Sequence, residues 1–241
     1  MLSFHPLAVI SALLLVLAGC SAPAPSGIFD PYEEQNRRTH AFNVALDRNV
    51  ARPVSRAFGG AGGGAVSTGF GNVGRNLSLP SEVLNKTLQG RFEDAVHNAW
   101  RLVVNTTIGV GGLFDPATAM GLDRRKTDFG ETLHVWGMGE GAYLELPVLG
   151  PSTERDMLGR VADAIIDPLG AVLRPREANV ARAVKIGSKL GDRARFGDSV
   201  DSILYESADS YAQLRLLYLQ NRRFELGQEA ADDEFLDPYA D

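Results

Sequence analysis

Cysteine is almost absent from this sequence of 241 residues, in which Cys20 is the single example. A disulfide within the chain is therefore excluded. Histidine is also scarce: after the first twenty residues only His40, His97 and His134 remain, and none has a second ligand type at metal-binding spacing. We therefore expect no metal site.

The sequence also lacks an excess of basic residues and any long apolar run after Cys20. The formal net charge is −6. An acidic chain is a poor binder of nucleic acid, and it gains nothing from electrostatic attraction to anionic lipid. No stretch of about 18 residues after Cys20 is both apolar and uncharged, so we predict no transmembrane helix.

No catalytic residue set is identifiable. Residues 69–74 match the pattern G-x-G-x-x-G, but a dinucleotide site needs a buried strand before it, and here a run of glycine and alanine precedes it. No serine lies in a G-x-S-x-G turn, and there is no P-loop. These absences favour binding or transport over catalysis, so we expect a protein that is not an enzyme and uses no cofactor.

The first twenty residues have the pattern of an export signal. The apolar stretch from Leu7 to Ala18 is too short to span a membrane and fits the central region of a signal peptide. It ends in Leu17-Ala18-Gly19-Cys20, which resembles a bacterial lipobox: small residues precede the cut, and the thiol accepts diacylglycerol. We predict a signal peptide over residues 1–19, lipidation of Cys20 and a flexible tether over 20–29. The alternative is an N-terminal core helix with a buried cysteine.

Apolar residues recur at helical spacing through most of the remaining chain. The predicted helices are a stripe from Phe42 to Phe58 broken or kinked at Pro53, about 80–88 ended by Gly90, 92–103, 155–166, 177–190 and about 199–224. Glycine-rich residues 59–64 predict a flexible break, and 105–115 and 129–150 predict loops rather than long strands. We predict one mostly helical domain over residues 30–226 and an acidic disordered tail over 227–241.

The amphipathic helices allow two interpretations. Most such helices face a protein core, and the sequence by itself favours that commoner case. In a lipid-tethered chain, a broad apolar face can instead lie in the interface of a bilayer. The segment from Phe92 to Val103 has the cleanest apolar stripe and is the place where the two interpretations differ most.

Several short motifs, in order along the mature chain, resemble the MlaA (VacJ) family of outer-membrane phospholipid-transport lipoproteins. The most specific is Asp128-Phe129-Gly130-Glu131-Thr132-Leu133. The others are Asp30-Pro31-Tyr32-Glu33, Asn36-Arg37, Phe42-Asn43, Arg52-Pro53-Val54, Asn72-Val73, Asn76-Leu77, Pro80, Asn85, Leu88-Gln89-Gly90, 105–112, Phe114-Asp115, Gly137, Gly139, Gly141, Tyr143, Leu146-Pro147, Gly150-Pro151-Ser152 and Arg155-Asp156. One departure is Ser207-Ala208-Asp209-Ser210-Tyr211, where the family often has a proline before the tyrosine; without it, the last helix can run on unbroken.

The resemblance implies a mainly α fold: a single ring-like helical domain embedded in the periplasmic leaflet of the outer membrane, with glycine-rich loops and a central amphipathic channel. It implies removal of mislocalised phospholipid from the outer leaflet, delivery to a periplasmic carrier of the MlaC type, and a position beside a trimeric porin. The alternatives are an envelope scaffold lipoprotein associated with porins and an envelope hydrolase.

Residues of the lipid path are harder to predict from the sequence. Charges interrupt apolar faces in the segment 177–190 and near Arg215, so we predict that Lys185, Lys189 and Arg215 line or gate the path. The commoner explanation of such charges is a solvated helix face.

Overall fold

The helices of this chain follow one another with short connections, as the periodicity predicts. The computed structural model describes residues 28–60 and 63–228. The predicted signal peptide, Cys20 and most of the tether lie outside the described residues, as does the tail from residue 229. The elements are α2 (Glu33–Leu46), η1 (Asp47–Ala51), α3 (Arg52–Gly60), α4 (Gly63–Asn76), α5 (Leu79–Leu88), α6 (Phe92–Thr107), α7 (Pro116–Ala119), α8 (Phe129–Val135), β1 (Tyr143–Leu146), β2 (Gly150–Thr153), α9 (Glu154–Ile166), α10 (Pro168–Val172), α11 (Pro175–Arg195), α12 (Gly197–Asp201), η2 (Ser202–Glu206) and α13 (Ser210–Glu225).

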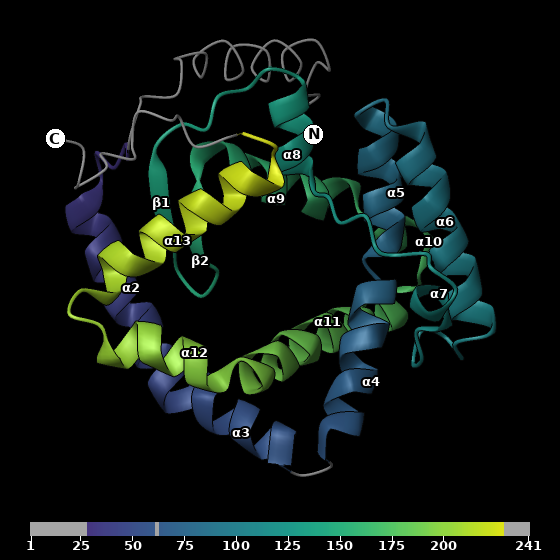
Figure 1. The fold of residues 1–241 in the computed structure, drawn as a ribbon, viewed down its shortest axis with the longest axis horizontal. Helices are drawn as coiled ribbons and strands as arrows, with labels where there is room; N and C mark the ends of the chain where they lie inside the picture. Colours follow the sequence, from purple (N-terminus) through teal and green to yellow (C-terminus); the bar gives the residue numbers. More distant parts are fainter. Residues whose placement is uncertain (1–27, 61–62, 229–241) are drawn as a thin grey trace, which may run out of the picture.

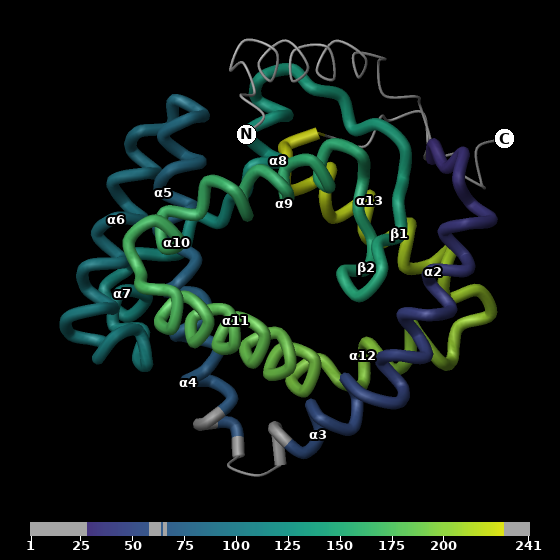
Figure 2. The backbone as a smooth tube through the Cα atoms, turned by 180° about the vertical axis from the view of Figure 1, so that it is seen from behind, coloured from purple at the N-terminus to yellow at the C-terminus, as the bar shows by residue number. Residues whose placement is uncertain are grey.

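These elements are arranged as a ring (Figures 1 and 2). Helices α2 and α3 form one side, α4 to α7 lie across from α2, and α8, α9 and α13 close the ring together with the hairpin β1–β2. The long helix α11 packs against both α3 and α4. Among the helices that the described residues form, none is both long enough and apolar enough to cross a membrane.

The distribution of polar and apolar side chains is the reverse of that in a water-soluble domain. Among the described residues, more polar and charged side chains are buried than apolar ones, and the buried apolar cluster consists of Tyr143, Tyr211 and Leu219 with Tyr218 beside it. Large apolar side chains are exposed on most of the helices. A soluble monomer rarely exposes apolar surface this widely.

Helix α6 shows this reversal most clearly. Its apolar stripe faces outward, with Phe92 65% and Trp100 60% exposed. Its buried face carries Asn98, Arg101 and Asn105 instead. Arg101 is held there by both carboxylate oxygens of Asp115, at 3.0 Å each. The interpretation that this stripe packs against a protein core is therefore wrong.

Phe42, Val50 and Val54 of the first predicted stripe are also exposed, and Pro53 does not break the helix there. The chain runs from α2 through a five-residue π-helical turn, η1, directly into α3. A π-turn displaces the hydrogen-bond ladder by one residue, which accommodates a proline that has no N–H to donate. The predicted glycine break is also reduced, because Gly59 and Gly60 belong to α3 and α4 begins at Gly63.

Two further predictions need correction. The glycine-rich segment 129–150 contains helix α8 and strand β1, and β1 pairs antiparallel with β2 in a short hairpin. The last helix does not run unbroken from 199 to 224, because the chain is extended at Ser207 and α13 begins anew after Asp209. The Asp209 carboxylate accepts a hydrogen bond from the backbone N–H of Ala212. Such an N-cap starts a helix without the help of a proline.

Candidate functional site

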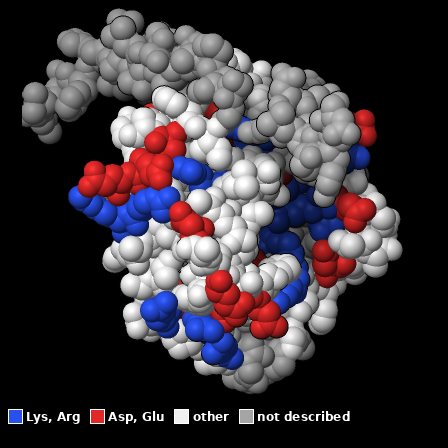
Figure 3. All heavy atoms as spheres, turned by 60° about the vertical axis from the view of Figure 1, so that its left-hand side comes forward, with Lys and Arg blue, Asp and Glu red and all other residues white. Residues whose placement is uncertain are grey.

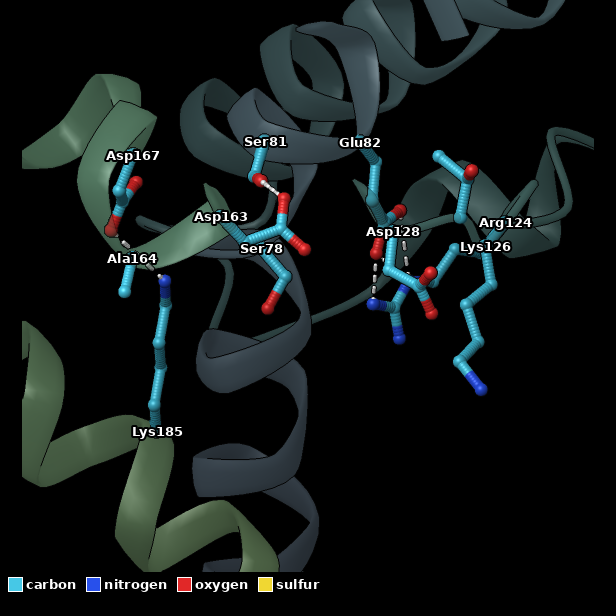
Figure 4. A pocket seen from close by; sticks show the side chains of 11 residues that line it. Ser78, Ser81, Glu82, Arg124, Lys126, Asp128, Asp163, Ala164, Asp167 and Lys185 are labelled. Atoms are coloured by element: carbon cyan, nitrogen blue, oxygen red, sulfur yellow. Dashed lines mark hydrogen bonds and ion pairs between the residues drawn. The ribbon is translucent and has the colours of Figure 1, made fainter. Parts of the chain in front are cut away.

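A polar cavity of about 330 Å³ lies where α5, the segment before α8, the α9–α10 corner and α11 meet (Figure 4). A second cavity of about 190 Å³ lies beside it, toward α13, and the two share Lys126, Asp128 and Asp163. The first is lined by Ser78, Ser81, Glu82, Arg124, Lys126, Thr127, Asp128, Asp163, Ala164, Asp167 and Lys185. The second adds Asp156, Arg160, Tyr218, Asn221, Arg222 and Glu225. A space-filling view shows basic and acidic side chains interleaved around a hollow of the molecule (Figure 3).

Helix termini place several of the acidic groups. Asp128 caps α8 by accepting the backbone N–H of Glu131 at 2.8 Å. Asp167 caps α10 by accepting the N–H of Leu169 at 3.1 Å. Each cap fixes its side chain, because the carboxylate satisfies an N–H that the first helical turn leaves unpaired. In both cases the aspartate directly precedes the first residue of the helix, as Asp128-Phe129 and Asp167-Pro168.

Most charges around the cavities are neutralised in pairs. Both oxygens of Glu82 accept hydrogen bonds from Arg124, at 3.0 and 3.1 Å from Nε. Lys185 lies 3.7 Å from Asp167, and the two close one side of the first cavity in Figure 4. Lys126 forms an ion pair with Glu225 at 2.9 Å. These pairs leave little net charge on the cavity wall.

Arg222 joins two carboxylates at the second cavity. It is 7% exposed and donates to Asp128 and Asp156, at 2.7 and 2.9 Å from Nη2. Burial opposes the ionisation of Asp128, but the adjacent guanidinium outweighs that effect and holds the pKa of Asp128 below its usual range. Asp156 also lies 3.6 Å from the fully buried Arg155. The wall at α8, α9 and α13 is therefore a fixed ionic network.

Asp163 differs from the other acidic groups. Its carboxylate accepts hydrogen bonds from Asn85 at 2.8 Å, from Ser81 at 3.3 Å and from the backbone N–H of Phe129 at 3.0 Å. Within residues 28–60 and 63–228, no lysine or arginine lies within ion-pair distance of it. Burial raises its pKa, and the nearby Asp128 acts in the same direction. A charge without a counterion thus faces both cavities.

The three residues predicted for a lipid path lie in different surroundings. Lys185 lines the first cavity. Lys189, one turn further along α11, is exposed. Arg215 lies on α13, where it forms ion pairs with Asp30 and Glu33 and stacks on the ring of Tyr211. A role for these residues in a path remains a prediction, and Arg215 has a structural role that its sequence position did not reveal.

The remaining sequence motifs carry no chemistry that the described residues support. The G-x-G-x-x-G match at 69–74 lies inside helix α4, so no strand precedes it. Within the part of the chain that the structure describes, no group of three or more His, Asp or Glu side chains could hold a metal ion. His97 on α6 contacts the backbone carbonyl of Asp123, in the segment after α7, at 2.7 Å.

The sequence analysis missed Asp163, Arg160 and Arg222. Nothing local distinguishes Asp163 or Arg160 from ordinary polar positions on the amphipathic helix α9. The motif at 128–133 was a signal for Asp128, but its partner Arg222 is 94 residues away. Such pairings depend on the closure of the ring, and a spacing rule within one helix does not find them.

Comparison with known proteins gives concordant results. The family model for the MlaA lipoprotein matches residues 28–225. The Escherichia coli (strain K12) protein named intermembrane phospholipid transport system lipoprotein MlaA is 33% identical over 224 residues, which is 89% of this chain and 87% of that protein. An uncharacterised protein of Rickettsia bellii is 32% identical over 196 residues, 81% of this chain and 76% of the relative.

A solved structure agrees with the sequence comparisons. It comes from work on the structural basis for maintenance of bacterial outer membrane lipid asymmetry. It superimposes with a TM-score of 0.70 at 32% sequence identity, and the match covers 82% of this chain and 98% of that one. Because the family model matches nearly all described residues and the solved structure agrees, the chain belongs to the MlaA lipoprotein family.

Proposed function

We propose that this protein is an outer-membrane lipoprotein that removes mislocalised phospholipid from the outer leaflet. The lipid passes through an amphipathic path inside the helical ring to a periplasmic carrier of the MlaC type, which maintains the lipid asymmetry of the membrane. The names of the Escherichia coli and Shigella flexneri relatives, which describe intermembrane phospholipid transport, support this assignment.

The observation that carries the proposal is the reversed distribution of side chains on the ring. Exposed apolar side chains such as Trp100 and Ile165 (60% and 78% exposed) would each be costly in water, at about 25 cal/mol per Å² of apolar surface. Burial of the outer face of the ring in the hydrocarbon of one leaflet removes this cost. The apolar exterior therefore suits a ring embedded in the periplasmic leaflet, without a spanning helix.

The polar interior suits the headgroup of a phospholipid. A headgroup that crosses an apolar layer loses its hydration, and polar groups along its path replace the lost hydrogen bonds. The cavities at α5, α9 and α11 offer such groups. This transfer requires no covalent chemistry, so the protein acts as a transporter and not as an enzyme, and its partners supply the energy.

The predicted lipid on Cys20 provides the anchor. Each buried CH₂ of an acyl chain contributes roughly 0.8 kcal/mol, so several chains together make the attachment stable. Because the anchor and the apolar exterior act on the same leaflet, the ring is held at a fixed depth. A trimeric porin beside it would cover part of the exposed apolar surface.

Outer-leaflet phospholipid in whole cells tests the proposal. A deletion strain should accumulate phospholipid in the outer leaflet, and the wild-type gene should reverse this, whereas Cys20→Ala should not. An unchanged leaflet in a deletion strain that also lacks paralogues would refute transport. The exposed apolar side chains of the ring would then favour the second candidate function, a scaffold whose apolar faces are buried against a porin.

A further inference from the structure

Helix α9 presents two uncompensated charges of opposite sign to the joined cavities. Arg160 and Asp163 both line the second cavity, and Asp163 also lines the first. Residues three apart on a helix lie on one face, with Cβ atoms about 5–6 Å apart. The side chains of Arg160 and Asp163 do not form an ion pair with each other within the described residues. They are therefore adjacent, and both remain open to a ligand.

Every other charge on the two cavity walls has a partner of opposite sign. The pairs are Glu82–Arg124, Asp167–Lys185, Lys126–Glu225, Asp128–Arg222 and Asp156–Arg155. Among the described residues, Arg160 instead donates to two backbone carbonyls alone, those of Leu149 and Pro151, at 3.5 and 3.1 Å. Since carbonyls carry no formal charge and a guanidinium has five N–H donors, Arg160 retains both its charge and unused donors.

The Asp163 carboxylate can accept a further hydrogen bond. Its three hydrogen bonds, from Ser81, Asn85 and the N–H of Phe129, hold the carboxylate in place without neutralising it. Two carboxylate oxygens offer about four lone-pair sites, so capacity for a further donor remains. In Figure 4 Asp163 lies between the Asp167–Lys185 pair and the Glu82–Arg124 pair. The described residues do not offer a metal-binding group there.

On the basis of the proposed transport function, we propose that the joined cavities recognise a phospholipid whose headgroup carries a primary ammonium. The phosphate binds Arg160 and the ammonium binds Asp163. Phosphate and ammonium in such a headgroup are separated by two carbons, a spacing that one helical turn can match. The cavity volumes are about 330 and 190 Å³. Pockets for whole drug-sized ligands are about 300–1,000 Å³, so these cavities suit a group of the size of a headgroup.

The site distinguishes two headgroups through Asp163. An ammonium supplies N–H donors and a positive charge to the carboxylate, whereas the glycerol of an anionic headgroup supplies hydroxyls alone. Both headgroups would donate to the ionised carboxylate, but only the ammonium adds the attraction between opposite charges. We expect a preference of roughly tenfold for the ammonium headgroup, which corresponds to about 1.4 kcal/mol.

The test measures which lipid the purified full-length lipoprotein retains. The protein in mild detergent is incubated with an equimolar mixture of phosphatidylethanolamine and phosphatidylglycerol, separated from free lipid, and analysed by mass spectrometry. Wild type should retain phosphatidylethanolamine in excess. Asp163→Asn should lose the excess of phosphatidylethanolamine and retain the two lipids in the ratio of the mixture. Arg160→Gln should retain less of both classes, and Arg160→Lys should restore retention.

Matched controls are Asp198→Asn and Arg195→Gln, which make the same charge changes at exposed positions away from both cavities. If wild type retains the two lipids in the ratio of the mixture, the inference is overturned and the transport function is not. This outcome is read from wild type alone, so it does not depend on whether a variant folds. Undiminished enrichment by a folded Asp163→Asn protein would also overturn it, because Asp163 would then only tie α5 to α9. If wild type retains no phospholipid, the proposed function itself is at fault.

Discussion

The contact between α8 and α9 has almost no room for a side chain, and this makes Gly159→Ala an informative change. A Cβ on Gly159 would lie 2.3 Å from the backbone nitrogen of Gly130 and 2.6 Å from its Cα. Both are backbone atoms, so no side-chain rotation relieves the clash. Overpacking typically costs about 1–3 kcal/mol. We expect the upper part of this range here, because backbone has to move. The higher helix propensity of alanine offsets about 1 kcal/mol of that cost.

The expected net loss is about 2 kcal/mol. For a chain of this size, 1 kcal/mol corresponds to roughly 2–4 °C, so the Tm should fall by roughly 4–8 °C. The assay is thermal unfolding of purified protein in detergent, followed by circular dichroism at one scan rate. Gly170→Ala in α10 is the control, because a Cβ there meets nothing within 4 Å; it should leave the Tm unchanged or raise it. An unchanged or higher Tm for Gly159→Ala would refute the packing argument.

Two further changes test the electrostatics and the outer surface. The Arg37 guanidinium lowers the pKa of Asp209 to about 2, against about 3.9 in an unfolded chain. This carboxylate therefore stabilises the fold above pH about 4, and the contribution is lost as the pH falls toward 2. Asp209→Asn should lower the Tm at pH 7 and have no effect near pH 2; a constant difference across this range would contradict the assignment. Trp100→Asp in a Cys20→Ala background should reduce co-sedimentation with membranes, because a charge deep in the bilayer costs about 2.5–3.5 kcal/mol. Trp100→Leu should not, and equal sedimentation of the two would show that α6 does not face lipid.

Local sequence signals predicted most helices correctly. Helix α5 ends as expected, with Gly90 at a φ of +73° after the last turn, and α9 and α11 enclose the predicted segments 155–166 and 177–190. The failures have two causes. The π-turn at η1 and the new start of α13 depend on local features, Pro53 and the cap at Asp209, that helical periodicity does not register. The hairpin β1–β2 also contacts a distant segment, since Asn36 donates a hydrogen bond to the carbonyl of Tyr143.

The candidate site was predicted only at Lys185. The cavity is formed by α5, α9 and α11 together, so its acidic members became visible only through their contacts. Ser81 and Asn85 lie 82 and 78 residues before Asp163 in the chain, and yet they hold its carboxylate. The absence of a counterion at Asp163 is likewise a property of the assembled ring.

The sequence by itself determined the helical content and the family, because both depend on residues near one another in the chain; the lipobox at Cys20 stays a prediction. It did not determine which face of a helix points outward. The periodicity of α6 is the same whether Trp100 packs in a protein core or against lipid, since the helical repeat does not depend on the surroundings of the apolar face. Only the tertiary structure decided that apolar side chains such as Trp100 are exposed and that paired charges line the cavities, because both depend on how the ring closes.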